Sequence, residues 1–240
     1  MMFNDRRDAG RKLARALERF KGTNPLVLAL PRGGVPVGFE VALHLRASLD
    51  LLLVRKIGAP GHEELALGAV VDGLCPQVVV NQEIVDMIQP PRGYFEAAEK
   101  RELAEIERRR RLYLGAAQPI DVKGRVAIVV DDGIATGATM KAALRGVRQN
   151  KPSRIVLAVP VAPQSVIRDL KEECDEMVFL ATPEPFYAVG LYYADFSQTT
   201  DEEVIELLGR RQSFTPAPRK DGEVARSESQ SNAAPPRLAP

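Results

Sequence analysis

The stretch IVVDDGIATGATMKAAL, residues 128–144, contains three features in one short segment. An apolar run ends in two adjacent carboxylates, Asp131 and Asp132, a Gly/Thr/Ala loop follows, and a helical pattern begins near Ala138. Continuous Val/Ile/Leu runs are typical of strands that are covered on both faces, as in parallel sheets. The segment therefore predicts a strand, a loop and a helix of an α/β fold.

Apolar runs and helical patterns alternate along most of the chain. Strands are predicted at residues 25–30, 50–55, 125–130, 154–159 and 177–180, and helices at 35–46, 138–149 and 164–172. Two short runs, at 69–71 and 77–80, predict a hairpin. We expect an open, mainly parallel sheet that is flanked by helices.

Residues 82–114 interrupt this alternation and predict a helical insertion. The segment is rich in helix formers, and pairs such as Glu105–Arg109 are spaced i,i+4 with the acid first. The run Arg108–Arg111 is compatible with a phosphate or RNA site, but a solvated last helical turn is the favoured interpretation. From residue 212 the chain is rich in Pro, Ser and charge, so we expect a folded domain over 1–211 and a disordered tail over 212–240.

The composition limits the class of protein. The 240 residues are 45% hydrophobic and 27% charged with a net charge of +1, which gives no reason to expect nucleic acid or a membrane as partner. Two distant cysteines, Cys75 and Cys174, suit a reduced interior, and no apolar run approaches the roughly 18 residues of a membrane helix. A cytoplasmic location is expected.

The loop after the acid pair has the composition of an anion site. Thr136, Gly137 and Thr139 lie where backbone N–H groups, hydroxyls and a helix N-terminus can bind one phosphate. The two carboxylates would repel that phosphate, whereas they can accept hydrogen bonds from a cis-diol. A ribose 5-phosphate satisfies both halves. A simpler alternative is that the two acids only cap a turn, and no Walker A or G-x-G-x-x-G dinucleotide motif is present.

The strand, the acid pair and the T-G-x-T loop together resemble the signature of type I phosphoribosyltransferases. The resemblance extends over roughly residues 20–190, towards a bacterial group of predicted phosphoribosyltransferases of unassigned substrate. It implies that Asp131 and Asp132 hold the ribose diol of 5-phosphoribosyl 1-pyrophosphate. It also implies that the 5-phosphate is held by Ala135, Thr136, Gly137, Ala138 and Thr139. The implied reaction transfers the phosphoribosyl group to a nitrogen nucleophile and releases pyrophosphate. Mg²⁺ is expected to arrive with the substrate, without a direct protein ligand.

Two further loops share the resemblance. Arg32, Gly33 and Gly34 follow the first strand, where the family binds pyrophosphate, often through an unusual peptide geometry. The alternative is a simple glycine-rich turn before a helix. After the second strand, Arg55 and Lys56 precede the loop 57–68, which looks like the family's mobile catalytic flap. Catalytic roles are predicted for Arg55 and Lys56, and for the flap residues Glu63 and Glu64.

Residues 181–196 gather aromatic side chains and resemble the family's variable hood over the acceptor. Phe186 and Tyr187 are the predicted acceptor-binding residues, while Tyr192 and Tyr193 also fit core packing. Ala135 replaces the acid that 6-oxopurine enzymes carry before the T-G of the loop, which argues against hypoxanthine or guanine as acceptor. The acceptor stays open, the chain is compatible with a homo-oligomer, and a non-catalytic sensor of the same ligand is the alternative function.

Overall fold

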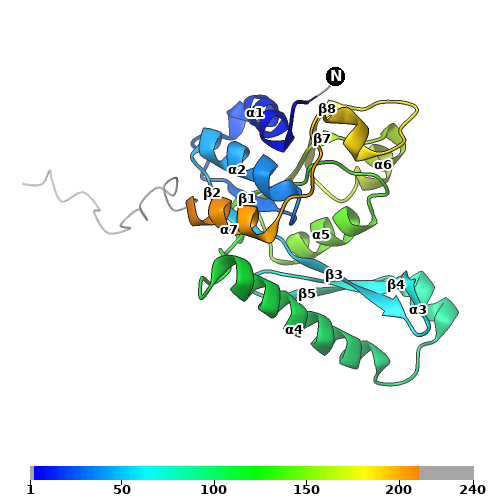
Figure 1. Cartoon of the computed structure of the whole chain (residues 1–240). Helices are drawn as coiled ribbons and strands as arrows, with labels where there is room; N and C mark the ends of the chain where they lie inside the picture. The colour runs from blue at the N-terminus through cyan, green and yellow to red at the C-terminus, as the bar shows by residue number, and fades with distance from the viewer. Residues whose placement is uncertain (1–2, 211–240) are drawn as a thin grey trace, which may run out of the picture.

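The computed structural model describes residues 3–210, and its centre is a five-stranded parallel sheet (Figure 1). The strand order is β2-β1-β6-β7-β8. The strands are β1 (Leu26–Ala29), β2 (Ser48–Leu51), β6 (Val126–Val130), β7 (Arg154–Val161) and β8 (Glu176–Ala181). The predicted open, mainly parallel sheet is confirmed.

Helices cover both faces of this sheet. Alternate strand residues such as Val27 and Ile128 pack against α1 (Arg6–Ala16), α2 (Gly34–Leu45) and α7 (Asp201–Gly209) on one face. The other face packs against α5 (Ala138–Gln149) and α6 (Gln164–Leu170). Because both faces are buried, the strands consist of the continuous apolar runs that the sequence shows.

A second, antiparallel sheet carries the residues between β2 and the insertion. It has the order β3-β4-β5, with β3 (Val54–Ala59), β4 (His62–Val71) and β5 (Gln77–Val80). Helix α5 lies between the two sheets, where Gly146 packs so closely on Val71 that an added Cβ would lie 2.5 Å from the Val71 Cβ (Figure 1). The predicted hairpin of 69–71 and 77–80 is confirmed as the pair β4–β5.

Two predictions on this segment are wrong. The single strand 50–55 is in fact the end of β2 and the start of β3, which belong to different sheets, because Val54 leaves the main sheet and pairs with Val71. The predicted loop 57–68 is mostly the β3–β4 hairpin, which turns at Pro60 and Gly61. An uninterrupted apolar run gives no signal for a change of sheet.

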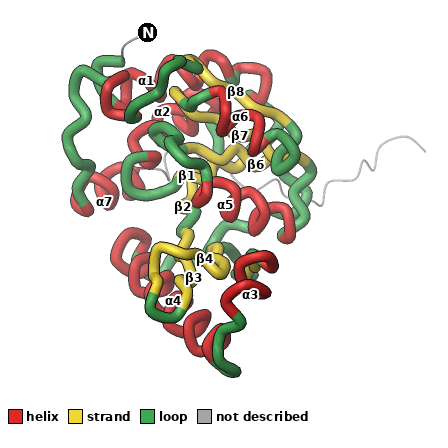
Figure 2. The backbone as a smooth tube through the Cα atoms, turned by 90° about the vertical axis from the view of Figure 1, so that its right-hand side faces the viewer, coloured by secondary structure: helices red, strands yellow, loops and turns green. Residues whose placement is uncertain are grey.

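The helical insertion is confirmed as α3 (Gln82–Ile88) and α4 (Tyr94–Leu114), which lie against the small sheet (Figure 2). Glu105 pairs with Arg109, with 2.7 Å between the carboxylate Oε1 and Nε. The run Arg108–Arg111 is not uniformly solvated as predicted, because Arg110 is only 8% exposed. Its side chain turns inward to two buried acids that are described below.

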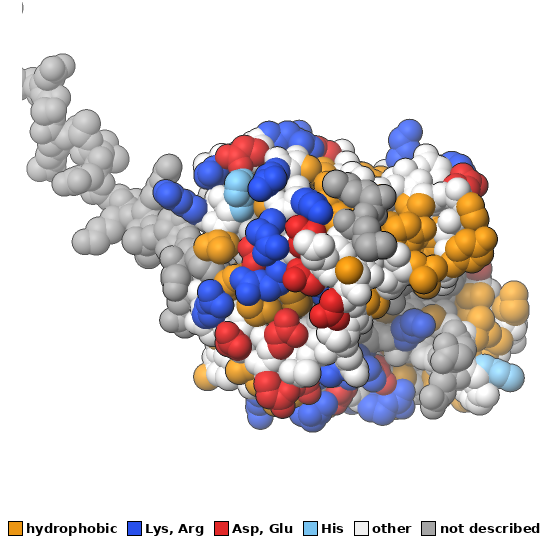
Figure 3. Space-filling model, turned by 45° about the horizontal axis from the view of Figure 1, so that its top comes forward, with side chains coloured by type: hydrophobic (Ala, Val, Ile, Leu, Met, Phe, Trp, Pro, Cys, Tyr) orange, Lys and Arg blue, Asp and Glu red, His pale blue; other side chains and the backbone are white. Residues whose placement is uncertain are grey.

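Two helices of the structure, α1 and α7, were not predicted. Both pack on α2, and both begin at a side-chain cap: Asp5 accepts from the Asp8 N–H at 2.6 Å, and Thr200 accepts from the Glu203 N–H at 3.2 Å. The predicted disordered tail, 212–240, lies outside the described residues. No helix within residues 3–210 is both long and apolar enough to cross a membrane. Basic and acidic side chains are intermixed over the face shown in Figure 3.

Candidate functional site

The acid pair, Asp131 and Asp132, and the loop Arg32–Gly34 meet at the point where the strand order of the main sheet reverses. β1 and β6 are parallel neighbours, but the chain continues from β1 to β2 on one side and from β6 to β7 on the other. In open parallel sheets, ligands bind in the crevice at the carboxyl ends of such strands. Asp131 and Asp132 follow β6, and Arg32–Gly34 follow β1, so the structure brings both predicted motifs to this edge of the sheet, where such a crevice is expected.

Gly33 and Gly34 lie directly against the two acids. A Cβ added to Gly33 would lie 2.1 Å from Asp132 Oδ2, and one added to Gly34 would lie 2.8 Å from the Val130 carbonyl oxygen. No side chain fits at either position without movement of the neighbouring atoms. The peptide bond between Pro31 and Arg32 is cis, an unusual peptide geometry of the kind that the resemblance implies.

Arg32 is part of this loop but faces helix α7. Its Nη1 lies 3.5 Å from Asp201 Oδ1, and the Tyr113 hydroxyl donates to the same carboxylate at 2.7 Å. Burial, together with this hydrogen bond, raises the pKa of Tyr113 to about 12. Arg32 is thus held beside the crevice by an acid at the start of α7.

Both site carboxylates are held in a poorly solvated position. Burial raises the pKa of Asp131 well above its usual range, and the neighbouring Asp132 carboxylate raises it further. Burial also raises the pKa of Asp132, although a hydrogen bond and the charge of Arg6 act in the opposite direction. Titratable groups with strongly shifted pKa values in a crevice are typical of functional sites.

The predicted phosphate loop follows the acid pair at the N-terminus of α5. Gly137 precedes the helix with a φ of +78°, which side-chain-bearing residues rarely adopt, and an added Cβ would lie 2.7 Å from Val166 Cγ1. Ala135, Thr136, Ala138 and Thr139 lie at the surface of this loop and of the first turn of α5. Because the first N–H groups of a helix have no intrahelical acceptor, they are available to an anion at this position.

The two predicted cations are adjacent on strand β3 and have different contacts. Arg55 Nε donates to Glu102 Oε2 on α4 at 3.0 Å, whereas Lys56 lines a cavity of about 470 Å³ together with Ala138 and Thr139. Both also line a second cavity, of about 840 Å³. Lys56 is therefore brought to the phosphate loop, and Arg55 joins the hairpin to the insertion. The side chains of Glu63 and Glu64 lie outside the described part, so their predicted roles stay predictions.

The hood packs on the acid-pair loop. A Cβ added to Gly133 would lie 2.4 Å from Val189 Cγ1. Phe186 stacks on Tyr192, with 5.6 Å between ring centroids, and Tyr187 is 77% exposed. Tyr193 is buried, and its hydroxyl donates to the Asp132 carbonyl oxygen. Tyr193 therefore supports the loop, as core packing would require, while Tyr187 has the exposure that ligand contact needs.

One residue at the site was missed by sequence reasoning. Arg6, the first residue of α1, donates from Nε to Asp132 Oδ2 at 2.7 Å, although the two residues are 126 positions apart. The sequence contains no signal for this contact, because it depends on how α1 packs on α2. A cap such as Asp5 could have shown where α1 begins, but not what its side chains touch.

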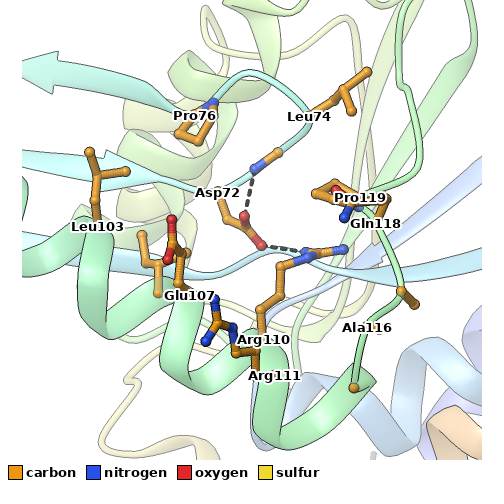
Figure 4. Close-up of a pocket in the computed structure, with 14 residues that line it drawn as sticks. Asp72, Leu74, Pro76, Leu103, Glu107, Arg110, Arg111, Ala116, Gln118 and Pro119 are labelled. Atoms are coloured by element: carbon orange, nitrogen blue, oxygen red, sulfur yellow. Dashed lines mark hydrogen bonds and ion pairs between the residues drawn. The ribbon is translucent and has the colours of Figure 1, made fainter.

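A second cluster of two acids and one arginine lies away from the crevice. Arg110 Nη2 donates to both oxygens of Asp50 on β2, at 2.8 and 2.9 Å, and Arg110 Nη1 donates to Asp72 directly after β4. Burial raises the pKa of Asp72, and Arg110 partly offsets this rise. Asp72 and Arg110 line a cavity of about 700 Å³ beside the 115–119 segment (Figure 4). The cluster joins the main sheet, the small sheet and α4, which is a structural role.

Asp131 and Asp132 could bind a metal ion only through their carboxylate oxygens. Among the described residues, no group of three or more His, Cys, Asp or Glu side chains lies close enough together to hold a metal ion. Two adjacent carboxylates do fit a hard cation such as Mg²⁺ that has further oxygen ligands of its own.

Comparison with known proteins agrees with this geometry. Residues 4–194 match the family model described as phosphoribosyl transferase domain. The chain belongs to the phosphoribosyl transferase family. The matched residues include the acid pair, both glycine loops and most of the hood, so the resemblance seen in the sequence is confirmed.

One curated relative is longer than this chain, whereas one solved structure is matched over its whole length. A protein of Mycobacterium tuberculosis (strain ATCC 25618 / H37Rv) named "Putative phosphoribosyl transferase Rv0571c" is 45% identical over 210 residues, which are 87% of this chain and 47% of that protein. The chain thus spans about half the length of the curated relatives it matches. The crystal structure of TT1426 from Thermus thermophilus has a TM-score of 0.74 at 43% identity, with 90% of this chain and 100% of that chain covered.

Proposed function

We propose that this phosphoribosyl transferase family member transfers the 5-phosphoribosyl group of 5-phosphoribosyl 1-pyrophosphate to a nitrogen nucleophile. The observation that carries the proposal is the contact between the acid pair and the Gly33–Gly34 loop, with the phosphate loop following the same acids. A diol-binding pair between two anion-binding loops matches a ribose that carries a phosphate at C5 and a pyrophosphate at C1. Few other metabolites have this order of groups.

The proposed reaction exchanges one bond at C1 of the ribose. The bond from C1 to the pyrophosphate oxygen breaks, and its electron pair leaves with the pyrophosphate. The lone pair of the acceptor nitrogen forms the new bond to C1, and the nitrogen then loses its proton. Because positive charge develops on the ribose in the transition state, the protein's main tasks are to position the two reactants, neutralise the leaving group and exclude water.

The described residues divide these tasks between them. Asp131 and Asp132 accept the ribose hydroxyls, and the first N–H groups of α5 with Thr136 and Thr139 hold the 5-phosphate. The backbone at Gly33 and Gly34 can approach the pyrophosphate because neither residue carries a side chain. Lys56 adds positive charge in the cavity that it shares with Thr139. Mg²⁺ bound to the substrate would neutralise part of the pyrophosphate charge, and the acid pair supplies oxygen atoms that suit it.

The acceptor site is proposed under the hood, with Phe186 and Tyr187 as the residues that contact it. Both are aromatic, and Tyr187 is free to stack on a planar ligand. The identity of the acceptor, a cytoplasmic location, the absence of nucleic acid and membrane partners, and a homo-oligomeric state stay predictions.

A sensor that binds the same ligand without catalysis is the second candidate. One observation favours it: Arg32 and Arg55, two of the three predicted cations, are already paired with Asp201 and Glu102. An enzyme would need at least one of them to exchange its partner for pyrophosphate during turnover.

Pyrophosphate release tests the two candidates against each other. The protein would be incubated with 5-phosphoribosyl 1-pyrophosphate, Mg²⁺ and a panel of purines, pyrimidines and small amines, with binding of 5-phosphoribosyl 1-pyrophosphate measured by calorimetry. Release that depends on one acceptor is the expected result and identifies that acceptor. Binding without release for any acceptor would favour the sensor, and no binding would exclude both.

A further inference from the structure

Arg6 touches the acid pair from an element that contains none of the family motifs. The Nε–H of Arg6 donates to Asp132 Oδ2 at 2.7 Å, and both side chains are largely buried, at 12% and 15% exposure. Among the described residues, Arg6 is the only cation in ion-pair contact with either acid. A charge-assisted hydrogen bond at this distance is one of the stronger polar contacts in a protein.

Arg6 is itself held on its other sides. Its Nη1 donates to the Ser197 carbonyl oxygen at 2.6 Å, and its guanidinium lies 3.9 Å from the centre of the Phe196 ring. The N-terminal segment is fixed to the hood as well, because the Phe3 N–H donates to the Tyr192 carbonyl oxygen at 2.8 Å. The guanidinium is therefore held in one position, and the carboxylate that it contacts is held with it.

The other groups around Asp132 are placed differently. Asp131, its neighbour, shares a side-chain hydrogen bond with Asp132 but carries no positive charge, and the Tyr193 hydroxyl donates to the Asp132 backbone rather than to its carboxylate. The facing loop from β1 presents Gly33, and the nearby Arg32 is paired with Asp201. Among the described residues, Arg6 is thus the cation that contacts the Asp132 carboxylate.

We propose that Arg6 is a positioning residue of the ribose site, which fixes the Asp132 side chain with one oxygen left free for the ribose hydroxyls. A carboxylate has two oxygens and about four lone-pair positions, so the contact with Oδ2 leaves Oδ1 able to accept. The inference rests on the proposed function, because it assigns the free oxygen to a ribose. It adds a residue from α1 to a site that otherwise consists of loops after β1 and β6.

The opposite role would also follow from the same contact. If Arg6 had to leave Asp132 before the ribose could bind, it would compete with the substrate. The two roles differ in sign: loss of a positioning residue weakens binding, whereas loss of a competitor strengthens it.

Calorimetry on three variants separates these outcomes. Arg6→Gln removes the charge, Arg6→Lys keeps it, and Arg7→Gln is the matched control, because Arg7 is the next residue on α1 and pairs with Glu40 at 2.6 Å. At neutral pH we expect Arg6→Gln to weaken binding of 5-phosphoribosyl 1-pyrophosphate about 10-fold to 100-fold, Arg6→Lys to recover part of the loss, and Arg7→Gln to stay within about 2-fold. Unchanged or tighter binding by Arg6→Gln would overturn the proposal.

Recovery of affinity by Arg6→Lys is the readout that a merely structural role would not give, because lysine keeps the charge of the guanidinium but not its shape. Equal affinity of Arg6→Lys and Arg6→Gln would contradict the proposed role of the charge.

A ligand-free measurement separates failure of this inference from failure of the proposed function. Crystal structures of the unliganded variants show the Asp132 side chain directly, and Arg6→Gln should change its orientation while Arg7→Gln leaves it unchanged. If the wild type bound no 5-phosphoribosyl 1-pyrophosphate, the ribose assignment would be wrong whatever the orientation of Asp132. If the wild type bound it and the Asp132 side chain did not move in Arg6→Gln, Arg6 would not be the residue that positions Asp132.

Discussion

Two clusters in this molecule have the same composition and opposite properties. The core cluster consists of Asp50, Asp72 and Arg110, and the site cluster consists of Asp131, Asp132 and Arg6. In the core cluster the arginine donates to both acids, and Asp50 also accepts from the Leu51 and Ile120 N–H groups at 2.8 Å. In the site cluster the arginine donates to one acid only.

The difference lies in the hydrogen-bond acceptors that remain. Asp50 and Asp72 are 2% and 4% exposed, and protein donors occupy their oxygens, while the buried Arg110 Nε beside them has no hydrogen-bond partner among the described residues. Asp131 accepts from the Asp132 N–H at 2.8 Å, and the pair lies partly buried beside Gly33 and Gly34. We therefore expect identical residue types to stabilise the fold in one place and to form the ribose site in the other. Arg110 donates to both acids of the core cluster, whereas Arg6 donates to one acid of the site cluster.

The largest expected effect is on the core cluster. Arg110→Met leaves two buried carboxylates without a cation, so the free energy of unfolding should fall by about 3–5 kcal/mol at neutral pH, as measured by urea denaturation. The loss should shrink in acid, because protonation removes the unpaired charges. Arg111→Met is the matched control on the same helix, and its exposed side chain should make the effect less than about 0.5 kcal/mol. Equal effects of the two substitutions would show that the core cluster does not stabilise the fold.

A single methyl group should disturb the site cluster. The added Cβ of Gly33→Ala would lie 2.1 Å from Asp132 Oδ2, so the carboxylate or the loop must move. We expect the affinity for 5-phosphoribosyl 1-pyrophosphate to fall about 10-fold or more, which calorimetry measures directly. Gly209→Ala is the control, because nothing lies within 4 Å of its added Cβ. Unchanged affinity of Gly33→Ala would show that the loop and the acid pair do not act together.

The smallest expected effect is the change in the free energy of unfolding when one acid of each cluster is replaced by asparagine. It should have opposite signs in the two clusters. The pKa of Asp131 is raised in the folded protein, so its contribution to stability is present below the unfolded-state pKa and is lost as pH rises through the folded-state value. Asp131→Asn removes this loss, so it should stabilise the protein near pH 8 and have little effect near pH 4. Asp50→Asn should instead destabilise it, because Asp50 accepts four hydrogen bonds as an ion. Urea denaturation at both pH values checks the signs, and destabilisation by Asp131→Asn at pH 8 would contradict the account.

Local sequence signals predicted most of the fold and of the candidate site. The strand before Asp131, the αL glycine at 137 and the following helix are all encoded by neighbouring residues, so their positions could be predicted. The sequence Thr200–Glu203 also contains a cap and acid pattern that marks the start of α7. What the sequence could not provide are contacts between distant elements.

Three contacts between distant elements could not be predicted from the sequence. Arg6 reaches Asp132 only because α1 packs on α2, Arg110 turns inward only because β2 and β4 both end beside it, and the run after Asp50 changes sheets only because Val54 finds a partner in Val71. Each depends on tertiary packing, and none leaves a mark on the local periodicity of hydrophobic residues.

The most direct test of the central claim is a calorimetric titration of 5-phosphoribosyl 1-pyrophosphate with Mg²⁺ into the wild type and into Asp131→Asn/Asp132→Asn. The account predicts that the wild type binds and that the double variant, which keeps the shape of both side chains but not their charge, loses at least about 100-fold in affinity. Equal affinity of the two proteins would contradict the claim that this acid pair holds the ribose.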